Sequence, residues 1–364
     1  MKLLNCSLSE FNNSFSPKKI MFFGNGSWLK VIYGTELMDL NQYFSYVVDN
    51  NYSGKTVIGD ITLEVYPPKK LLEEKDCIII LTSPIYMYDM YKQLIEMGLD
   101  DNYTCYAFPF MQMVSKDIID NQLLNRITNN KEIIPKIIHS FWFSGEEKPE
   151  LYQKCIDSWK KILPDYEIVE WTKDNYDWHK HPFVERAIEL KAWAFAADYA
   201  RLDVLNRFGG IYLDMDVEVF KPFDDLLGNA AILAFSNHIM IDLAVIGAVS
   251  NLPLIKKLLQ LYNKTDIPEE HQGFVKYFQP AFVRNSLIGE GIKMNGSLQC
   301  VNDVAVFPRE FFMPQDHVFF GKYAKTGNTY CIHHDSFGWS FGKDSKREKK
   351  IRDNQALWDL IKNN

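Results

Sequence analysis

The chain has 364 residues, of which 47% are hydrophobic, so we expect about two or three domains with sizeable cores. A formal net charge of −7 argues against nucleic-acid binding, which relies on basic surface. No apolar run approaches the roughly 20 residues that cross a bilayer, and the first residues lack signal-peptide features, which predicts a cytoplasmic protein. The six cysteines have no C-x-x-C spacing, so buried free thiols are expected.

The first part of the chain alternates strand-like and helix-like segments. Strands are predicted at residues 19–27, 46–49 and 77–82, and a helix closed by Gly98 at residues 86–97. This alternation favours a parallel sheet, so we expect a small Rossmann-like domain. We place that domain at residues 1–125 and a second one at residues 126–364, because the pattern changes near residues 112–133.

A glycine turn and an acid occupy places where dinucleotide-binding folds hold pyrophosphate and ribose. Gly24 and Gly26 follow the first predicted strand, and Asp49 ends the next one. The third glycine of the fingerprint is missing and Lys30 falls near its place, so a tight turn and a plain strand end are the alternative. We interpret this domain as an accessory module that positions an acceptor, a partner or the membrane.

The second domain opens with a predicted strand at residues 134–143. Aromatic side chains at the carboxyl end of a strand can stack on a nucleotide base, and His139, Phe141 and Trp142 lie there. Core packing is the alternative for these side chains. A helix is expected next at residues 151–163, followed by a strand at residues 166–171.

Residues 192–205 are predicted to form an amphipathic helix. Asp198 and Arg201 are three residues apart and share a helix face, so they pair with each other or reach a ligand together. A surface ion pair is the alternative, because exposed pairs at this spacing are common and weak. Gly209 and Gly210 are expected to end the helix and turn the chain into the next strand.

That next strand leads into Asp214 and Asp216, two carboxylates separated by one residue. In an extended strand both side chains point the same way unless the chain bends. Two acids this close repel unless a cation lies between them, and hard oxygen ligands suit Mg²⁺ or Mn²⁺. A solvated acidic turn is the alternative, because the motif is short.

Three segments, in this order, resemble glycosyltransferase family 32, which includes bacterial capsular polysaccharide transferases and is similar to clostridial glucosylating toxins. The resemblance spans roughly residues 133–342. The segments are an opening strand, the Asp-Tyr-x-Arg helix with Gly-Gly-Ile-Tyr-Leu-Asp-x-Asp, and a closing His-His with Trp, at residues 134–143, 194–220 and 330–339.

Membership of that family implies a GT-A-type nucleotide-sugar domain, a UDP-sugar donor, and retention of the anomeric configuration. Asp216 would contact Mn²⁺ or Mg²⁺, and Asp214 would bridge the metal and the ribose or sugar. Asp198 and Arg201 would hold the donor's hydroxyls, with Arg201 also near the diphosphate. The segment from His139 to Trp142 would border the uracil and ribose.

Residues near the C-terminus are expected to complete this site. His334 is the predicted third metal ligand or a phosphate donor, because neutral imidazole suits Mn²⁺ better than Mg²⁺. Trp339 would donate its indole N–H to the diphosphate. The family's Ser before that Trp is Gly338 here, with one additional residue after the His pair, so His333 stays an alternative to His334. Incidental histidines on a C-terminal strand are the other alternative.

These features predict a glycosyltransferase that moves a sugar from a UDP-sugar to a glycan acceptor. A lipid-linked oligosaccharide in bacterial capsule or surface polysaccharide synthesis is the expected acceptor. The basic run at residues 343–352 predicts peripheral contact with anionic lipid at the inner face of the plasma membrane, with a solvated helix face as the alternative. The alternative functions are a non-catalytic scaffold of a polysaccharide-assembly complex and, disfavoured by the incomplete glycine fingerprint, an oxidoreductase or epimerase.

Overall fold

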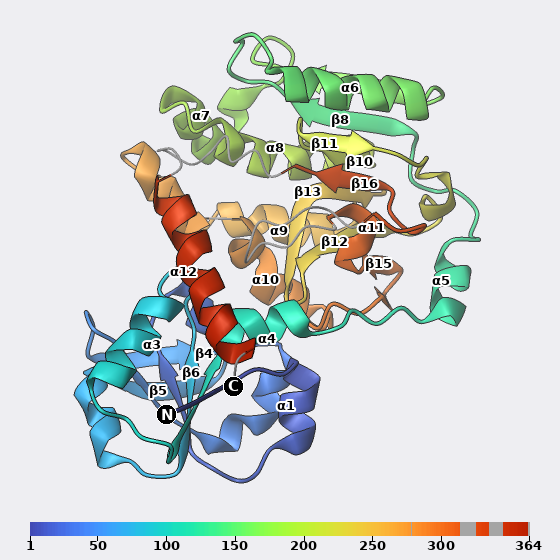
Figure 1. Ribbon diagram of the computed structural model, residues 1–364. Coiled ribbons are helices and arrows are strands. Elements are labelled where there is room, and N and C mark those ends of the chain that lie inside the picture. Colours follow the sequence, from blue (N-terminus) through green and yellow to red (C-terminus); the bar gives the residue numbers. More distant parts are fainter. Residues whose placement is uncertain (278, 314–324, 335–344, 363–364) are drawn as a thin grey trace.

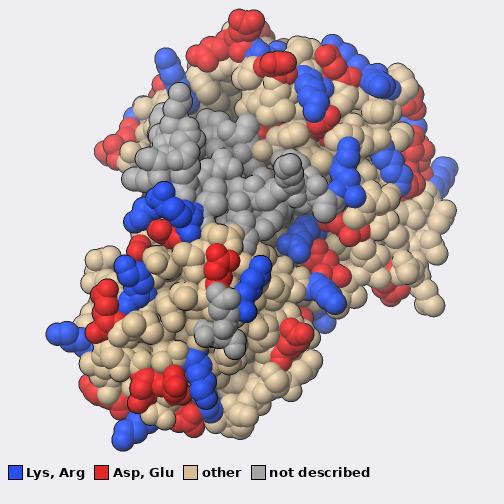
Figure 2. All heavy atoms as spheres, in the orientation of Figure 1, with Lys and Arg blue, Asp and Glu red and all other residues tan. Residues whose placement is uncertain are grey.

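The computed structural model describes the chain except for residues 278, 314–324, 335–344 and 363–364. It is a mixed α/β structure with two seven-stranded sheets and a two-stranded ribbon (Figure 1), which confirms the predicted α/β class. The first sheet is built from the N-terminal part of the chain and the second from the part that follows. Over the face drawn in Figure 2, acidic and basic side chains are interspersed among the described residues.

The first sheet has the order β1-β7-β6-β2-β3-β5-β4. All neighbouring strands in it are parallel except β4 and β5, as the alternation of strands and helices predicts. The order reverses between β2 and β6, as in doubly wound sheets. Its strands are β1 (Lys2–Leu4), β2 (Ile20–Phe23), β3 (Phe44–Val48), β4 (Gly54–Ile58), β5 (Ile61–Tyr66), β6 (Cys77–Leu81) and β7 (Tyr103–Ala107).

The glycine turn after β2 is occupied by the chain's own carboxylate. Gly24 has a φ of +108°, and a Cβ there would lie 2.5 Å from Oγ1 of Thr82. Asp49 accepts hydrogen bonds from the backbone N–H groups of Asn25 and Asn51, both at 2.8 Å. A phosphate at this turn would meet that carboxylate, so the geometry favours the tight-turn alternative over a dinucleotide site.

The second sheet has the order β14-β15-β12-β13-β10-β8-β9. Strand β10 is an interior strand of this sheet, next to the central strand β13, and it is antiparallel to β13 and parallel to β8. A separate ribbon pairs β11 (Val217–Val219) with β16 (Cys331–His333) in antiparallel fashion. The strands of the sheet are β8 (Ile137–Phe141), β9 (Glu167–Trp171), β10 (Gly210–Leu213), β12 (Ala231–Asn237), β13 (Met240–Ala248), β14 (Gln299–Val301) and β15 (Val304–Phe307).

Helices cover both sheets, and no described helix is long and apolar enough to span a bilayer. The α-helices are α1 (Leu8–Ser14), α2 (Ser27–Lys30), α3 (Met87–Glu96), α4 (Phe108–Val114), α5 (Asn121–Ile127), α6 (Glu150–Ile162), α7 (Pro182–Glu189), α8 (Trp193–Phe208), α9 (Pro253–Tyr262), α10 (Gln279–Gly289), α11 (Arg309–Phe312) and α12 (Ser345–Lys362). The 3₁₀ helices are η1 (Glu36–Tyr43), η2 (Pro68–Glu73), η3 (Trp178–Lys180), η4 (Asp224–Leu226) and η5 (His271–Tyr277).

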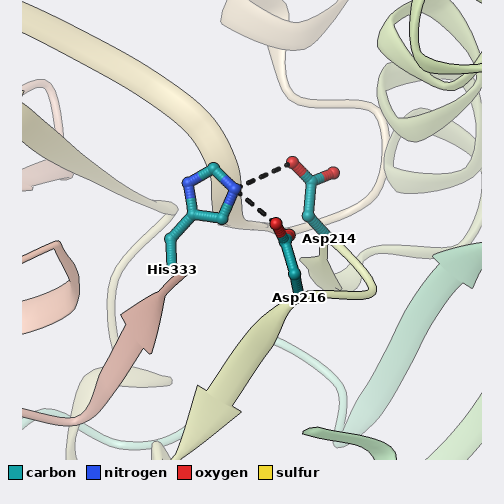
Figure 3. Close-up of side chains that lie close together, drawn as sticks. All are labelled: Asp214, Asp216 and His333. Atoms are coloured by element: carbon teal, nitrogen blue, oxygen red, sulfur yellow. Dashed lines mark ion pairs between the residues drawn. The ribbon is translucent and has the colours of Figure 1, made fainter. Parts of the chain in front are cut away.

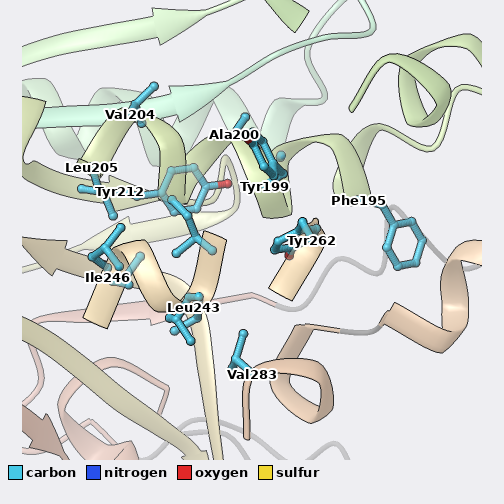
Figure 4. Close-up of a cluster of buried hydrophobic side chains, with 14 of the residues drawn as sticks. Phe195, Tyr199, Ala200, Val204, Leu205, Tyr212, Leu243, Ile246, Tyr262 and Val283 are labelled. Carbon is cyan, nitrogen blue, oxygen red and sulfur yellow. The ribbon is translucent and has the colours of Figure 1, made fainter. Parts of the chain in front are cut away.

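Helix α8 packs on the second sheet through the cluster drawn in Figure 4. Leu205 of α8, Tyr212 of β10 and Leu243 of β13 belong to this cluster and are each no more than 2% exposed. The helix is buried along most of its length, including Arg201 and Asp203. The expected amphipathic pattern is therefore wrong for the middle of α8, because α7 and α9 pack against this helix in addition to the sheet.

The two sheets are joined through buried contacts as well as through the chain. Ile239 and Met240 of the second part belong to the hydrophobic core of the first sheet. Helix α12 packs against α3 and β1, and its Leu357 is fully buried in the other core of the first sheet. The domain boundary at residues 125/126 stays a prediction. Residues 345–362, which that prediction assigns to the second domain, pack on the first sheet (Figure 1).

A buried guanidinium crosses the junction. Arg284 of α10 is 3% exposed and donates from Nη2 to the carbonyl oxygens of Val31 and Tyr33, both at 2.6 Å, and from Nη1 to that of Ile239. Burial lowers the pKa of Arg284 to about 9, and no carboxylate pairs with it in the described part of the chain. The dipoles of these three carbonyl groups therefore stabilise the buried positive charge.

Replacing Arg284 with Ala should lower the free energy of unfolding by about 3 kcal/mol. The carbonyls of Val31, Tyr33 and Ile239 lose their donor, and each buried unpaired polar group costs about 1–3 kcal/mol, partly offset by removal of the buried charge. Urea denaturation followed by tryptophan fluorescence measures the change.

Arg186 provides a matched control, because it also donates to two carbonyls, those of Pro268 and Glu269. Its side chain is 34% exposed, so water replaces the lost donor and Arg186→Ala should cost less than about 1 kcal/mol. Equal losses in the two variants would contradict the role given to Arg284.

Candidate metal and donor site

Two glycines place the acidic residues at the end of β10. Helix α8 ends at Phe208 and is capped by Gly209, which has a φ of +70°, and Gly210 follows with a φ of +104°. A Cβ on Gly210 would lie 2.7 Å from the carbonyl oxygen of Ile137, so the close approach of β10 to β8 requires glycine there. The predicted helix end and turn into a strand are confirmed.

The chain bends directly after β10, so Asp214 and Asp216 lie in a turn and not in the strand itself. The backbone N–H of Val217 donates to the carbonyl of Asp214 at 3.0 Å and closes this turn. The N–H of Asp214 donates in turn to the carbonyl of Ala244 in β13 at 2.9 Å. Both carboxylates thus project beyond the edge of the sheet on a backbone fixed by hydrogen bonds.

His333 joins these two carboxylates from β16 (Figure 3). Its Nε2 atom lies 3.2 Å from Oδ1 of Asp216 and 3.7 Å from Oδ2 of Asp214. One ligand atom from each of the three residues lies within 4.8 Å of the others. Two carboxylate oxygens and one imidazole nitrogen fit a divalent cation, and the nitrogen favours Mn²⁺ over Mg²⁺.

His334 occupies a different place. Its Nε2 atom lies 3.0 Å from Oε2 of Glu218, and Lys154 of α6 donates to the same oxygen at 2.8 Å. The backbone N–H of His334 donates to the carbonyl of Asp216 at 3.0 Å. The structure therefore brings His333, the alternative in the sequence analysis, to the carboxylates. Trp339 lies outside the described residues.

Arg201 forms the inner wall of the site and is 4% exposed. Its Nη2 atom lies 2.9 Å from Oδ1 of Asp198 and 3.2 Å from Oδ1 of Asp214. Its Nη1 donates to the carbonyl of Leu243 at 2.8 Å, and its guanidinium lies 4.4 Å from the ring centroid of Tyr212. Arg201 is thus a buried link between two carboxylates, whereas the sequence left a surface ion pair open.

Burial dominates the electrostatics of these acids. Desolvation raises the pKa of Asp198 to about 7, although Arg201 opposes the shift. Desolvation also raises the pKa of Asp214, while the charges of Arg201 and His333 lower it. A cation bound at the cluster would favour the ionised carboxylates further.

Two residues near this wall were not predicted from the sequence. Tyr212 is fully buried and donates its hydroxyl to Oδ1 of Asp214, so this oxygen has two donors and Oδ2 faces His333. Asp242 of β13 acts electrostatically on both Asp198 and Arg201. Strand periodicity points to Tyr212, because it lies two residues before Asp214, but no local pattern points to Asp242.

The predicted donor-binding aromatics lie mainly in packing positions. His139 is 1% exposed, with Nδ1 accepting from the indole N–H of Trp171 at 3.1 Å and Nε2 2.8 Å from the carbonyl of Gly209. Phe141 is 7% exposed in the core under α8. These positions match the core-packing alternative. Trp142 is only partly buried and donates its indole N–H to the carbonyl of Glu146 at 2.7 Å.

Substitution of Arg201 by Met should lower the free energy of unfolding by about 3 kcal/mol, because it leaves the buried carboxylates of Asp198 and Asp214 without their shared cation. Arg207→Met on the same helix is the control. Its side chain is 38% exposed, and its partner Asp203 keeps Lys180 at 2.5 Å, so a loss below about 1 kcal/mol is expected. Urea denaturation at pH 7 tests both, and a small loss for Arg201→Met would contradict the assignment.

Residues 149–233 match the family described as "Glycosyltransferase sugar-binding region containing DXD motif". This match includes Asp198, Arg201, Asp214 and Asp216 and ends before His333. The predicted family resemblance is therefore supported over the segment that carries the two carboxylates of the cluster.

Curated relatives also match the chain. Mannosyl phosphorylinositol ceramide synthase SUR1 of Saccharomyces cerevisiae is 27% identical over 172 residues, 43% of each chain. Inositol phosphoceramide mannosyltransferase 3 of Schizosaccharomyces pombe is 36% identical over 111 residues, 28% of this chain and 29% of the relative. An uncharacterized glycosyltransferase, L373, of Acanthamoeba polyphaga mimivirus is 36% identical over 102 residues, 26% of this chain and 41% of the relative. The chain thus spans less than half the length of these relatives.

Among solved structures, the PaToxG glycosyltransferase is 20% identical with a TM-score of 0.34, covering 47% of this chain and 74% of its own. The galactosyltransferase LgtC, in complex with donor and acceptor sugar analogs, is 14% identical with a TM-score of 0.31, covering 61% and 95%. From the sequence match, the chain carries the DXD-containing sugar-binding region of the glycosyltransferases, and the resemblance predicted from its sequence is confirmed.

Proposed function

We propose that the protein is a metal-dependent glycosyltransferase that moves a hexose from a nucleoside diphosphate sugar to an acceptor hydroxyl. The observation that carries this proposal is the cluster of Asp214, Asp216 and His333 directly beside the Asp198–Arg201 pair. Residues 126–364 would form the GT-A-type domain, and the donor expected from the family resemblance is a UDP-sugar.

Each site residue takes a role that fits its position. Asp216 and His333 would hold the metal, with Asp214 contributing Oδ2 because its Oδ1 is occupied by Arg201 and Tyr212. The bound cation supplies Lewis-acid stabilisation of the negative charge that develops on the leaving diphosphate. Asp198 is positioned to accept hydrogen bonds from donor-sugar hydroxyls, because its side chain is 13% exposed beside Asp214.

In this proposal, Arg201 binds groups of the protein and not the donor. Its Nε, Nη1 and Nη2 groups all have partners, in the carbonyls of Ala197 and Leu243 and in the two carboxylates. The guanidinium therefore orients Asp198 and Asp214 toward the donor, and direct contact with the diphosphate, expected from the sequence, is not needed.

The acceptor is proposed to be carried by a lipid. The family resemblance favours a lipid-linked oligosaccharide of bacterial surface polysaccharide synthesis. The matched yeast proteins are named for mannosyl transfer to inositol phosphoceramide, which makes a sphingolipid head group the second candidate. Both acceptors place the reaction at a membrane surface, consistent with the proposed cytoplasmic protein in peripheral membrane contact.

Retention of the anomeric configuration is part of the proposal and follows from the family resemblance. Among the described carboxylates near the donor position, Asp198, Asp214 and Asp216 have roles with the metal or the sugar hydroxyls, and Asp242 accepts a hydrogen bond from the backbone N–H of Ala244 at 3.0 Å. We therefore favour departure of the diphosphate and attack of the acceptor on the same face of the sugar over a glycosyl-enzyme intermediate. A covalent sugar trapped on the protein would contradict this choice.

Incubation with Mn²⁺ and a panel of UDP- and GDP-sugars, GDP-mannose included, should release nucleotide from one donor. Asp216→Asn should reduce release by at least about 100-fold, because the metal loses a carboxylate. Asp174→Asn removes an equal charge from an exposed turn and should leave the rate unchanged. Coupled detection of the nucleoside diphosphate measures release, and the absence of both release and nucleotide binding would favour the scaffold alternative.

The two lipid candidates are distinguished by offering each of them to the protein together with the nucleotide sugar from which nucleotide is released. Inositol phosphoceramide and a polyprenyl-linked oligosaccharide are offered separately in detergent, and mass spectrometry detects the added hexose. Sugar transfer to one of them should exceed hydrolysis by at least about tenfold, because the acceptor hydroxyl is positioned where water is not. Proton NMR of the product then reports the anomeric configuration, and inversion would overturn the retaining assignment.

A further inference from the structure

We propose that Glu218 is a positioning residue that directs His333 to the metal cluster by holding its neighbour His334 on the opposite face of the β11–β16 ribbon. This inference rests on the proposed function, since it concerns the third ligand of the cluster formed by Asp214, Asp216 and His333. It explains why, of two adjacent histidines, one lies with the carboxylates and the other does not.

The pairing of β11 with β16 sets the two faces. Val217 lies opposite His333, and Glu218 lies opposite Ile332. Side chains alternate along a strand, so Glu218 and His334 share one face as diagonal neighbours, and His333 shares the other with Val217. Cross-strand diagonal pairs are within reach of long side chains, and the 3.0 Å separation of Glu218 Oε2 from His334 Nε2 is such a contact.

A one-residue slip of this ribbon would exchange the two histidines. The register of a strand is normally set by which side chains are buried on one face of the sheet. Two adjacent histidines are equally polar, so burial of apolar side chains does not determine which of them faces the cluster. Strand β16 is three residues long, so its own ladder offers few hydrogen bonds. The Glu218 carboxylate makes the faces different, because it accepts a hydrogen bond from the imidazole that faces away from the cluster.

Helix α6 fixes Glu218 for this role. Lys154 donates to Glu218 Oε2 at 2.8 Å, and the carboxylate side chain is 14% exposed. On either side of Glu218, the indole N–H of Trp159 donates to the carbonyl of Val217 at 2.7 Å, and Ser158 Oγ accepts from the N–H of Val219 at 2.9 Å. Contacts from α6, which do not involve β16, therefore hold both the Glu218 side chain and the backbone on either side of it.

The metal would thus depend on a residue that does not touch it. Groups that orient metal ligands typically change metal affinity by about 10- to 100-fold when removed. Here the orientation works through the strand backbone: Glu218 holds His334, His334 is fixed to the Asp216 carbonyl by its N–H at 3.0 Å, and the preceding residue, His333, faces the carboxylates.

The test is Mn²⁺ affinity, measured by isothermal titration calorimetry with Mn²⁺ alone and with Mn²⁺ plus UDP or GDP. Glu218→Leu, which removes the acceptor but keeps the bulk, should weaken Mn²⁺ binding by at least about tenfold. His334→Leu should weaken it to a similar extent, and the double variant no more than either single variant, because both break the same contact. Glu218→Gln keeps an acceptor oxygen and should bind Mn²⁺ within about threefold of the wild type.

Asp157→Asn is the matched control, since it removes an exposed carboxylate from α6 whose partner is Gln153, and its Mn²⁺ affinity should equal that of the wild type. Pulsed EPR of bound Mn²⁺ adds a readout that general destabilisation does not move. The nitrogen coupling should disappear in His333→Ala, because His333 is the imidazole of the cluster. A coupling that persists in His333→Ala, or an unchanged affinity in Glu218→Leu, would overturn the inference.

A failure of the proposed function would give a different result from a failure of the Glu218 inference. It would appear as a wild-type protein that binds no Mn²⁺ with or without nucleotide, which also removes the premise of the inference. If Glu218→Leu does not fold, as judged by circular dichroism, the His334→Leu and Glu218→Gln variants carry the same comparison. A tenfold loss of affinity in Glu218→Gln with none in His334→Leu would assign the effect to charge and contradict positioning.

Discussion

The gathering of carboxylates at the end of β10 is the constraint on which the rest of the structure depends. Two like charges about 4 Å apart repel by roughly 4 kcal/mol at a protein surface, and Asp198, Asp214 and Asp216 meet in a partly buried place. Arg201 compensates Asp198 and Asp214 on the inner side. His333 lies on the outer side, where the proposed divalent cation would complete the compensation. The unbalanced charge of this site fits the proposed cation and the anionic donor that the cation would bind.

The surrounding elements serve this arrangement. Helix α8 delivers Asp198 and Arg201 on adjacent turns of one helix, and β13 supplies the carbonyls of Leu243 and Ala244 that hold Arg201 and the Asp214 backbone. The side chains of Leu243 and Ala244 lie in the hydrophobic cores on the two sides of the second sheet. Strand β13 therefore contributes both to the polar site and to the apolar cores, so a displacement of this strand that disrupts the packing also moves the carboxylates.

Local patterns in the sequence were enough to predict α8, the glycine pair and the acidic motif, because each of these depends on neighbouring residues. The choice between His333 and His334 was not accessible in that way. It depends on the register of β16 against β11, two strands more than 100 residues apart, and on Glu218, whose importance appears only after the strands pair. Arg201 was identified, but its burial was not, because it depends on packing of α8 against β13 and α9, which lie further along the chain. The packing of His139 against Trp171 and Gly209 is non-local in the same sense.

The contacts between the two sheets bear on how the site is held. The strand that carries His333 is followed, beyond the residues that the structure does not describe, by α12, which packs on the first sheet through Leu357 and donates from Asn354 to the carbonyl of Pro84 at 3.3 Å. Arg284 ties α10 to the carbonyls of Val31 and Tyr33, and Gln279 of the same helix donates to the carbonyl of Asp198 at 2.8 Å. Helix α10 therefore contacts both the first sheet's region and the carboxylate side of the site. A displacement of the N-terminal region, which the sequence predicts to be an accessory module, would be passed through this helix to the backbone of Asp198.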